Sequence, residues 1–134
     1  MERIIVWYLR MSVVYFVLGV VFGVVMLLQP GETGYCLPVH VHLNLLGFMP
    51  MMIYGVGYHI LPRFSGRNIY SPLLMRIQFW LGNAGLIGMA ISWPFVRGAA
   101  NVSLFDAVLI ASAFFSLISI VLFAINILKT IKSV

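Results

Sequence analysis

Two histidines stand two residues apart in an apolar stretch of the chain, LPVHVHLN over residues 37–44. Neutral imidazole is a common ligand of metal ions and of haem iron. Successive residues of an α-helix are separated by about 100° around its axis, so His40 and His42 point to nearly opposite sides of a helix. One pocket cannot easily use both imidazoles. The spacing therefore predicts that they serve two different sides of the helix that carries them.

The third histidine of the chain, His59, lies at the far end of the same apolar stretch and just before Ile60-Leu61-Pro62-Arg63. We interpret it as a partly hydrated residue at the membrane boundary; the alternative is a ligand or a proton-entry residue. For His40 and His42 the plain interpretation is a hydrated first helical turn, since Pro38 suits that position. Strongly apolar residues follow at once, however, and place the pair at or inside the hydrocarbon edge.

The composition sets the scaffold that must position these histidines. Of 134 residues, 63% are hydrophobic and 8% are charged, whereas about a quarter of residues are charged in a soluble domain. Four stretches lack Asp, Glu, Lys and Arg: residues 11–28, 37–62, 77–96 and 107–128. Each has close to the ~20 residues that cross a bilayer core. We predict one all-α transmembrane domain over residues 1–134, an up-down four-helix bundle with helices at about 4–28, 38–62, 72–95 and 104–128.

The charges indicate an orientation in the membrane rather than a nucleic-acid partner. Basic residues mark the N-terminus, the connection between the second and third stretches, and the C-terminus: Arg3, Arg10, Arg63, Arg67, Arg76, Lys129 and Lys132. The opposite side carries Arg97, Glu32 and Asp106. The positive-inside rule places both termini in the cytoplasm. We expect a multi-pass protein of a prokaryotic inner membrane, with His40 and His42 near its outer face.

Haem is the metal group that the histidines suit, and geometry restricts how it is held. Two histidines on one helix cannot bind the two faces of one macrocycle, and no other predicted helix carries a histidine. A second imidazole must then come from another copy of the chain or from another protein. Methionine is an alternative axial ligand, although we prefer to interpret the candidates as packing residues: Met49, Met51, Met52, Met75 and Met89.

Glycines recur on three of the predicted helices. Gly19 and Gly23 form a GxxxG pattern on the first, and further glycines follow on the second and third: Gly47, Gly55, Gly57, Gly82, Gly85 and Gly88. Small residues let membrane helices approach closely. They also leave room beside a flat ring, and the sequence leaves both uses open.

Along its whole length the chain resembles the first four helices of subunit I of the haem–copper oxidase superfamily, which includes the nitric oxide reductases. Four stretches carry the resemblance in order: residues 7–31, ending in MLLQPG; residues 48–62, FMPMMIYGVGYHILP; residues 76–81, RIQFWL; and residues 124–131, AINILKTI, preceded by Asp106, Ser116 and Ser119. The resemblance implies a subunit-I-like four-helix fold.

In that family a histidine on helix II ligates the low-spin haem. The matching position is His40, with a one-residue slip relative to the Met-Pro, and the choice between His40 and His42 stays open. The family's copper-ligating histidines and its later helices have no counterpart here, so we expect no copper and no complete oxidase. The family's outer arginines, which meet the haem propionates, have no counterpart here either, and Arg97 is the one outward-facing arginine that could take their place. Asn44 and Tyr35 are candidates to orient an imidazole or a propionate.

The family fold also suggests a use for both histidines. Subunit I has three similar four-helix arcs around a pseudo-threefold axis, and its helix X carries a His-x-His that faces two haem pores. If three copies of this chain formed a ring, each would offer His40 to one pore and His42 to the next. The resemblance therefore favours a homotrimer, with a dimer as the alternative, and haems at the subunit interfaces.

The function expected from these features is that of a small membrane cytochrome with haem b, which transfers electrons to or from a quinol or a c-type cytochrome. Three alternatives remain at this point. One is an accessory or partial subunit of a larger respiratory oxidase or nitric oxide reductase. Another is a gas-binding haem sensor, if one ligand is labile. The last is a channel or transporter without a cofactor, which would need an internal polar path.

Overall fold

The computed structural model describes residues 2–96 and 104–131, and every regular element within them is a helix. The α-helices are α1 (Arg3–Leu28), α2 (Thr33–His42), α3 (Met49–Phe64), α4 (Pro72–Val96) and α5 (Leu104–Thr130). A 3-10 turn, η1 (Pro30–Glu32), precedes α2, and a π-helical segment, η2 (Leu43–Phe48), joins α2 to α3.

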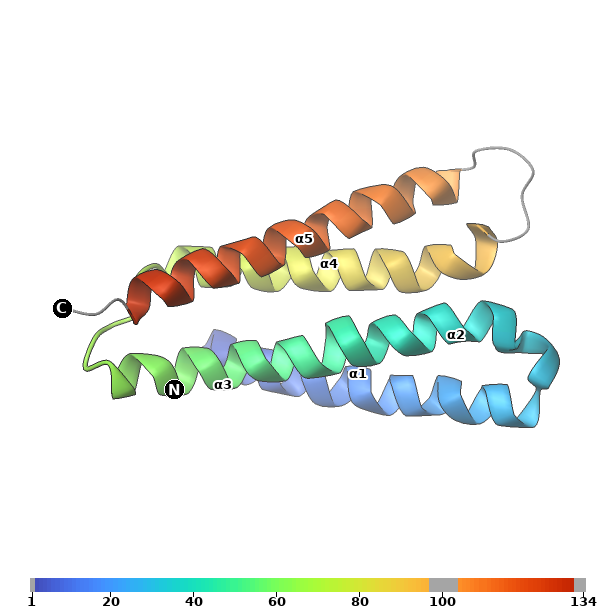
Figure 1. Ribbon diagram of the computed structural model, residues 1–134, viewed down its shortest axis with the longest axis horizontal. Coiled ribbons are helices and arrows are strands. Elements are labelled where there is room, and N and C mark those ends of the chain that lie inside the picture. Colours follow the sequence, from blue (N-terminus) through green and yellow to red (C-terminus); the bar gives the residue numbers. More distant parts are fainter. Residues whose placement is uncertain (1, 97–103, 132–134) are drawn as a thin grey trace.

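The elements α2, η2 and α3 run on as one long helix, so the described residues form four helices long and apolar enough to cross a membrane. Neighbouring helices run antiparallel (Figure 1). The start of α1 and the end of α5 lie at the same end of the bundle as the turn between α3 and α4. The all-α four-helix membrane fold predicted from the sequence is confirmed.

The predicted start of the second helix is wrong. It begins at Thr33 rather than at residue 38, because the 3-10 turn at Pro30–Glu32 leads straight into α2 without a loop. Pro38 therefore lies inside the helix and not in its first turn. The two histidines lie about two turns into this helix, so their predicted position in its first turn is wrong as well, while their hydration stays untested.

The π-helical segment lies directly after the two histidines. Its last turn is closed by the Met49 N–H, which donates to the carbonyl of Asn44 five residues earlier. Pro50 follows, and since proline has no N–H it cannot donate to the carbonyl of Leu46 as a regular α-helix would require. Wider turns of this kind occur as short bulges in α-helices, frequently at functional sites.

The helices α4 and α5 form the closest pair, because glycines of α4 face serines of α5. A methyl group on Gly85 would lie 2.7 Å from the carbonyl oxygen of Ser112 and 2.9 Å from the backbone nitrogen of Ser116. Gly82 and Gly88 face Ser119 and Ser112 in the same way. Small residues on both sides thus bring the two backbones together, as expected for membrane helices.

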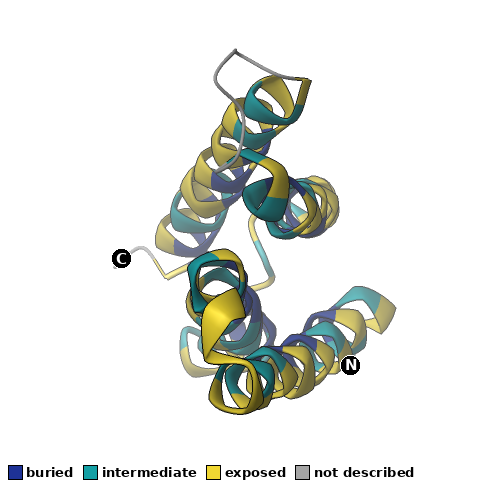
Figure 2. Cartoon of the chain, turned by 90° about the vertical axis from the view of Figure 1, so that its right-hand side faces the viewer, coloured by how far each residue is buried: buried dark blue, intermediate teal, exposed yellow. Residues whose placement is uncertain are grey.

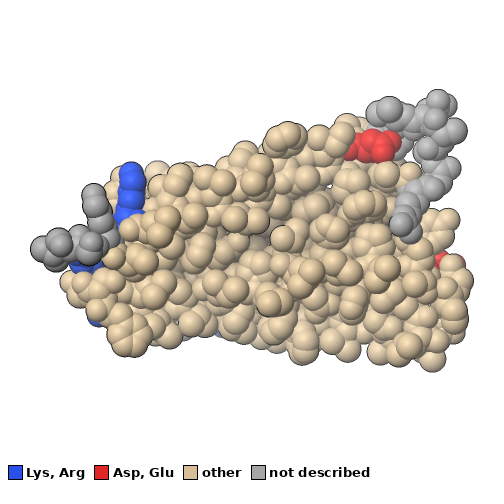
Figure 3. Space-filling model, viewed as in Figure 1, with Lys and Arg blue, Asp and Glu red and all other residues tan. Residues whose placement is uncertain are grey.

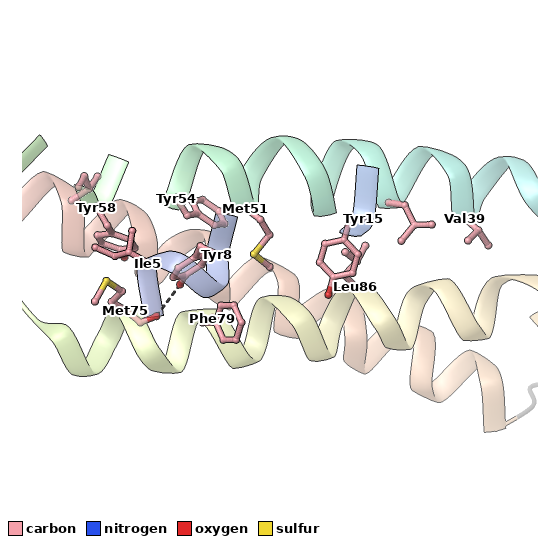
Figure 4. Close-up of a cluster of buried hydrophobic side chains, with 12 residues drawn as sticks. Ile5, Tyr8, Tyr15, Val39, Met51, Tyr54, Tyr58, Met75, Phe79 and Leu86 are labelled. Atoms are coloured by element: carbon pink, nitrogen blue, oxygen red, sulfur yellow. Dashed lines mark hydrogen bonds between the residues drawn. The ribbon is translucent and has the colours of Figure 1, made fainter. Parts of the chain in front are cut away.

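Aromatic and sulfur-containing side chains fill the centre of the bundle (Figure 4). The Tyr8 ring packs edge-on against Phe79 at a centroid distance of 5.0 Å, and its hydroxyl donates to the Met75 carbonyl at 2.8 Å. Met75 and Met51 are almost fully buried. These contacts fix α1 to α4 along the half of the bundle that holds the termini.

Buried amides tie the turn between α3 and α4 to α5. The Asn126 side chain accepts from the Ser71 N–H at 2.9 Å and donates to the Ser71 carbonyl at 2.9 Å. It also donates to the Tyr58 hydroxyl at 3.3 Å, and that hydroxyl donates to Gln78 at 2.5 Å. Four elements therefore meet at one hydrogen-bonded cluster.

The outward faces of the helices are apolar. Figure 2 shows buried residues along the inner sides of the helices and exposed residues on the outside, with α1 and α5 on opposite sides of the arrangement. Among the exposed residues are many valines, leucines and phenylalanines of α1 and α5, including Val13, Val17, Val20, Phe114 and Leu117. Such surfaces suit a hydrocarbon solvent, in agreement with an integral membrane protein.

Candidate functional site

His40 projects from α2 against α1. Its Nδ1 atom lies 2.7 Å from the carbonyl oxygen of Gly19. A carbonyl oxygen only accepts hydrogen bonds, so Nδ1 must carry the proton. The ring also faces Gly23, where a β-carbon would lie 3.2 Å from Cε1 of the imidazole.

His42 projects toward α4, on the other side of the helix. Its Nδ1 atom lies 2.7 Å from the carbonyl oxygen of Pro38, one turn earlier, and is therefore also the protonated nitrogen. Its ring lies beside the indole of Trp93, with ring centroids 5.9 Å apart. The two imidazoles thus face different neighbouring helices.

Both histidines have the same arrangement of ring nitrogens. With the proton on Nδ1, the lone pair is on Nε2, and within residues 2–96 and 104–131 neither Nε2 has a hydrogen-bond partner. Metal-bound histidines commonly donate the proton of the other ring nitrogen to a backbone carbonyl, which fixes the tautomer and the ring orientation. Each imidazole is therefore prepared to act as a ligand through Nε2.

The GxxxG pattern of α1 provides the space for His40. A side chain at Gly19 would collide with the amide of Asn44, and one at Gly23 would press on the imidazole. Of the two uses that the sequence left open for these glycines, close helix approach is what the structure shows, and room beside a haem ring stays a prediction. Close helix approach is what brings the Gly19 carbonyl within reach of Nδ1.

The other residues expected at this site are placed as follows. The Asn44 side chain donates to the backbone carbonyl of His40 at 2.8 Å, and so it contacts the helix backbone rather than the imidazole. Tyr35 lies on α2 with 43% of its surface exposed, and no side-chain hydrogen bond joins it to another described residue. Arg97 lies outside the described residues.

His59 does not join the other two histidines. About 25 Å of helix separates it from His42, at ~1.5 Å per residue. Its ring and its carbonyl contact the Arg63 side chain, with 3.1 Å between Nη1 and the carbonyl oxygen. Across the described residues, no group of three or more His, Cys, Asp or Glu side chains is arranged to hold a metal ion.

The candidate methionine ligands divide into two groups. Met51, Met75 and Met89 are buried, whereas Met52 is half-buried and Met49 is 48% exposed. Trp93 lies beside His42 and was not among the site residues predicted from the sequence. A tryptophan at a predicted span end is also the pattern of an interfacial aromatic belt, so its pairing with His42 has no separate signal in the sequence.

Comparison with known proteins adds a family to this geometry. The family model described as "Cytochrome C and Quinol oxidase polypeptide I" matches residues 3–134, nearly the whole chain. The chain belongs to this family. The relation to haem–copper oxidase subunit I that the motifs predicted is therefore confirmed, and membership implies haem cofactors in general.

Two curated members of the family match part of the chain. The cbb3-type cytochrome c oxidase subunit CcoN1 of Stutzerimonas stutzeri is 35% identical over 63 residues, which is 46% of this chain and 13% of that protein. The cytochrome c oxidase subunit 1 homolog of Agrobacterium tumefaciens (strain T37) is 36% identical over 56 residues, 40% of this chain and 10% of that protein. The chain thus matches only about one-tenth of the length of these relatives. No solved structure matches the chain.

Proposed function

We propose that this chain is a small membrane-bound cytochrome of b type that binds haem iron through His40 and His42. The observation that carries the proposal is the shared tautomer of the two imidazoles. Both donate Nδ1–H to a backbone carbonyl at 2.7 Å, which leaves Nε2 as the lone-pair nitrogen. That is the arrangement of an axial haem ligand.

The chain's own residues hold His40 in position for a ligand. Gly19 and Gly23 leave room between α1 and α2 for the imidazole and the Asn44 amide, which occupy that space. The Gly19 carbonyl fixes the ring angle, and Asn44 packs against the same glycine. On the other side, the Trp93 ring limits the orientations open to His42. A haem held by these imidazoles would supply one-electron transfer chemistry.

We propose that the two histidines serve two different haems at interfaces between copies. His40 faces α1 and His42 faces α4, so the two imidazoles cannot reach one iron atom from both sides of its ring. A head-to-tail interface would pair His40 of one copy with His42 of the next. Such interfaces close into rings, and the trimer matches the three arcs of the family fold.

The remaining elements of the proposal are the orientation and the partners. On the face shown in Figure 3, Lys and Arg side chains lie at the end of the bundle where α1 starts and α5 ends, and the visible acidic side chains lie at the opposite end. The positive-inside rule then places the termini in the cytoplasm and the two histidines near the outer face of a prokaryotic inner membrane. Electron exchange with a quinol or a c-type cytochrome follows from this location, and no copper site is part of the proposal.

A second candidate function is an accessory or partial subunit of a larger oxidase. The partial coverage favours it, because this chain matches 13% and 10% of its two curated relatives. In that case the histidines would ligate a haem shared with a different chain. The two functions differ in whether the purified chain retains haem by itself.

The reduced-minus-oxidised absorption spectrum of the detergent-purified chain tests the proposal, with His40→Ala and His42→Ala beside it. His59→Ala is the matched control, because it removes the same ring at the opposite end of the bundle. We expect a sharp low-spin spectrum in the wild type and the control, and a lost or high-spin spectrum in the other two variants. A colourless wild type, expressed with ample haem, would contradict the cytochrome and favour the accessory subunit.

A further inference from the structure

A polar cavity of about 670 Å³ opens at the end of the bundle opposite to His40 and His42. It lies between the start of α1, the end of α3 and the turn that leads into α4. Its polar lining comprises Glu2, Tyr58, His59, Arg63, Arg67 and Asn68. Its size is that of a small-molecule site, for which volumes of about 300–1,000 Å³ are usual.

The charge of the lining favours an anion. Among the described lining residues there are two arginines and one carboxylate, that of Glu2. The ring and carbonyl of His59 hold Arg63 through its Nη1 atom. A guanidinium has five N–H donors in a fork that matches phosphate oxygens, so Arg63 can donate to an anion from this position.

An apolar groove lies next to the cavity. It has a volume of about 380 Å³ and runs between α1 and α4, lined by residues that include Ile4, Trp7, Phe79 and Trp80. Ile5, the chain neighbour of Ile4, lines the cavity itself. A polar cavity at the membrane surface beside an apolar groove along the span matches the shape of a lipid, with a charged head and an acyl chain.

The cavity is separate from the histidine sites described above. About 25 Å of helix lies between His42 and His59, at ~1.5 Å per residue, which is too far for a group at the cavity to contact the imidazoles. Basic pockets at the cytoplasmic ends of transmembrane helices are the usual places where anionic lipid headgroups bind. The ligand of the cavity is therefore sought among lipids of the inner leaflet.

We propose that this cavity binds the phosphodiester of an anionic glycerophospholipid, with Arg63 and Arg67 on the phosphate and an acyl chain in the groove between α1 and α4. The lipid would join the ends of α1, α3 and α4. The proposal does not depend on haem binding, and either one can fail without the other.

Native mass spectrometry of the full chain with phosphatidylglycerol tests this proposal. The double variant Arg63→Gln/Arg67→Gln is compared with Arg76→Gln, which removes a basic charge at the same end of the bundle but does not line the cavity. We expect one tightly retained lipid in the wild type, and roughly fivefold weaker binding for each cavity arginine removed. Arg76→Gln is expected to bind as the wild type does.

Three results would overturn the proposal. An equal loss in Arg76→Gln would indicate diffuse attraction to the basic end of the protein. Equal retention of phosphatidylcholine would show that an anionic headgroup is not required, and displacement of the lipid by inorganic phosphate alone would indicate a free-phosphate site.

Glu2→Gln provides a further check, because loss of the carboxylate should strengthen binding of phosphatidylglycerol. A weakening would instead indicate a headgroup with an ammonium group, such as phosphatidylethanolamine.

Discussion

Nδ1 of His40 donates a hydrogen bond to the carbonyl oxygen of Gly19, 2.7 Å away on the neighbouring helix α1. In a regular helix this carbonyl accepts the N–H of Gly23, so the imidazole shares an acceptor that the backbone already uses. The bond is possible because Gly19 and Gly23 have no side chains between the two helices. A motif for helix packing thereby also determines the tautomer and direction of a candidate metal ligand.

Gly23→Leu should abolish the haem signal that depends on His40. Even a β-carbon at this position would lie 3.2 Å from Cε1 of the imidazole, so a larger side chain must displace the ring. We expect an absorption spectrum like that of His40→Ala. Val24→Leu is the control, since the next residue is 47% exposed on the outside of the same helix. An unchanged spectrum in Gly23→Leu would show that haem binding does not depend on this groove.

Subunits carrying His40→Ala and subunits carrying His42→Ala should complement one another when co-expressed. Each variant alone lacks one ligand at every interface of a homomeric ring. In a mixed ring, an interface regains both ligands where an intact His40 meets an intact His42. Every mixed trimer has one such interface out of three, so mixed rings should hold about one third of the wild-type haem if ligation is head-to-tail between copies. Haem per protein, measured after tandem affinity purification with two tags, would stay near zero if both ligands came from one chain.

Asn126→Ala should destabilise the bundle without changing the histidine sites. The amide makes three hydrogen bonds, two with the backbone of Ser71 and one with the Tyr58 hydroxyl. At roughly 0.6 kcal/mol for each bond between membrane helices, the loss is about 2 kcal/mol in the free energy of unfolding. Unfolding in increasing SDS measures it, with Ile125→Ala on the exposed face as the control. Equal loss in both variants would show that the amide contributes nothing beyond packing.

Gly85→Ala should separate α4 from α5. The added methyl group would meet backbone atoms of Ser112 and Ser116 at 2.7 and 2.9 Å, and backbone cannot rotate away as a side chain can. Overpacking of this kind costs about 1–3 kcal/mol. Gly57→Ala is the matched control, because its nearest neighbour is a Phe123 ring atom at an ordinary 3.5 Å. The same unfolding assay should show a neutral or stabilising effect there, since alanine favours helices.

Cys36 offers a direct check on where the second helix begins. It lies within α2, whereas a helix starting at residue 38 would leave it in a loop. Its side chain is partly buried. We expect a maleimide that cannot cross the membrane to label Cys36 more slowly than a cysteine placed at Gly31, where nothing lies within 4 Å of an added β-carbon. Equal labelling rates would favour the shorter helix.

The sequence by itself determined the number of spans, their antiparallel order and the family. Length and hydropathy set the spans, because backbone in a bilayer must satisfy its own hydrogen bonds and an apolar stretch of about 20 residues can do so only as a helix. The spacing of His40 and His42 likewise fixed their divergence, since it follows from helix geometry alone. Local rules sufficed for these features.

Only the tertiary structure decided what each histidine faces. One example is the start of α2 at Thr33, and another is the π-helical segment after His42. Both lie near prolines, and whether a proline starts, ends or widens a helix depends on the helix around it. That the Gly19 carbonyl accepts a hydrogen bond from His40, and that Trp93 lies beside His42, depends on how α1 and α4 pack against α2. Contacts between distant segments arise from packing of whole helices, and no periodicity within one helix encodes which neighbour it will meet.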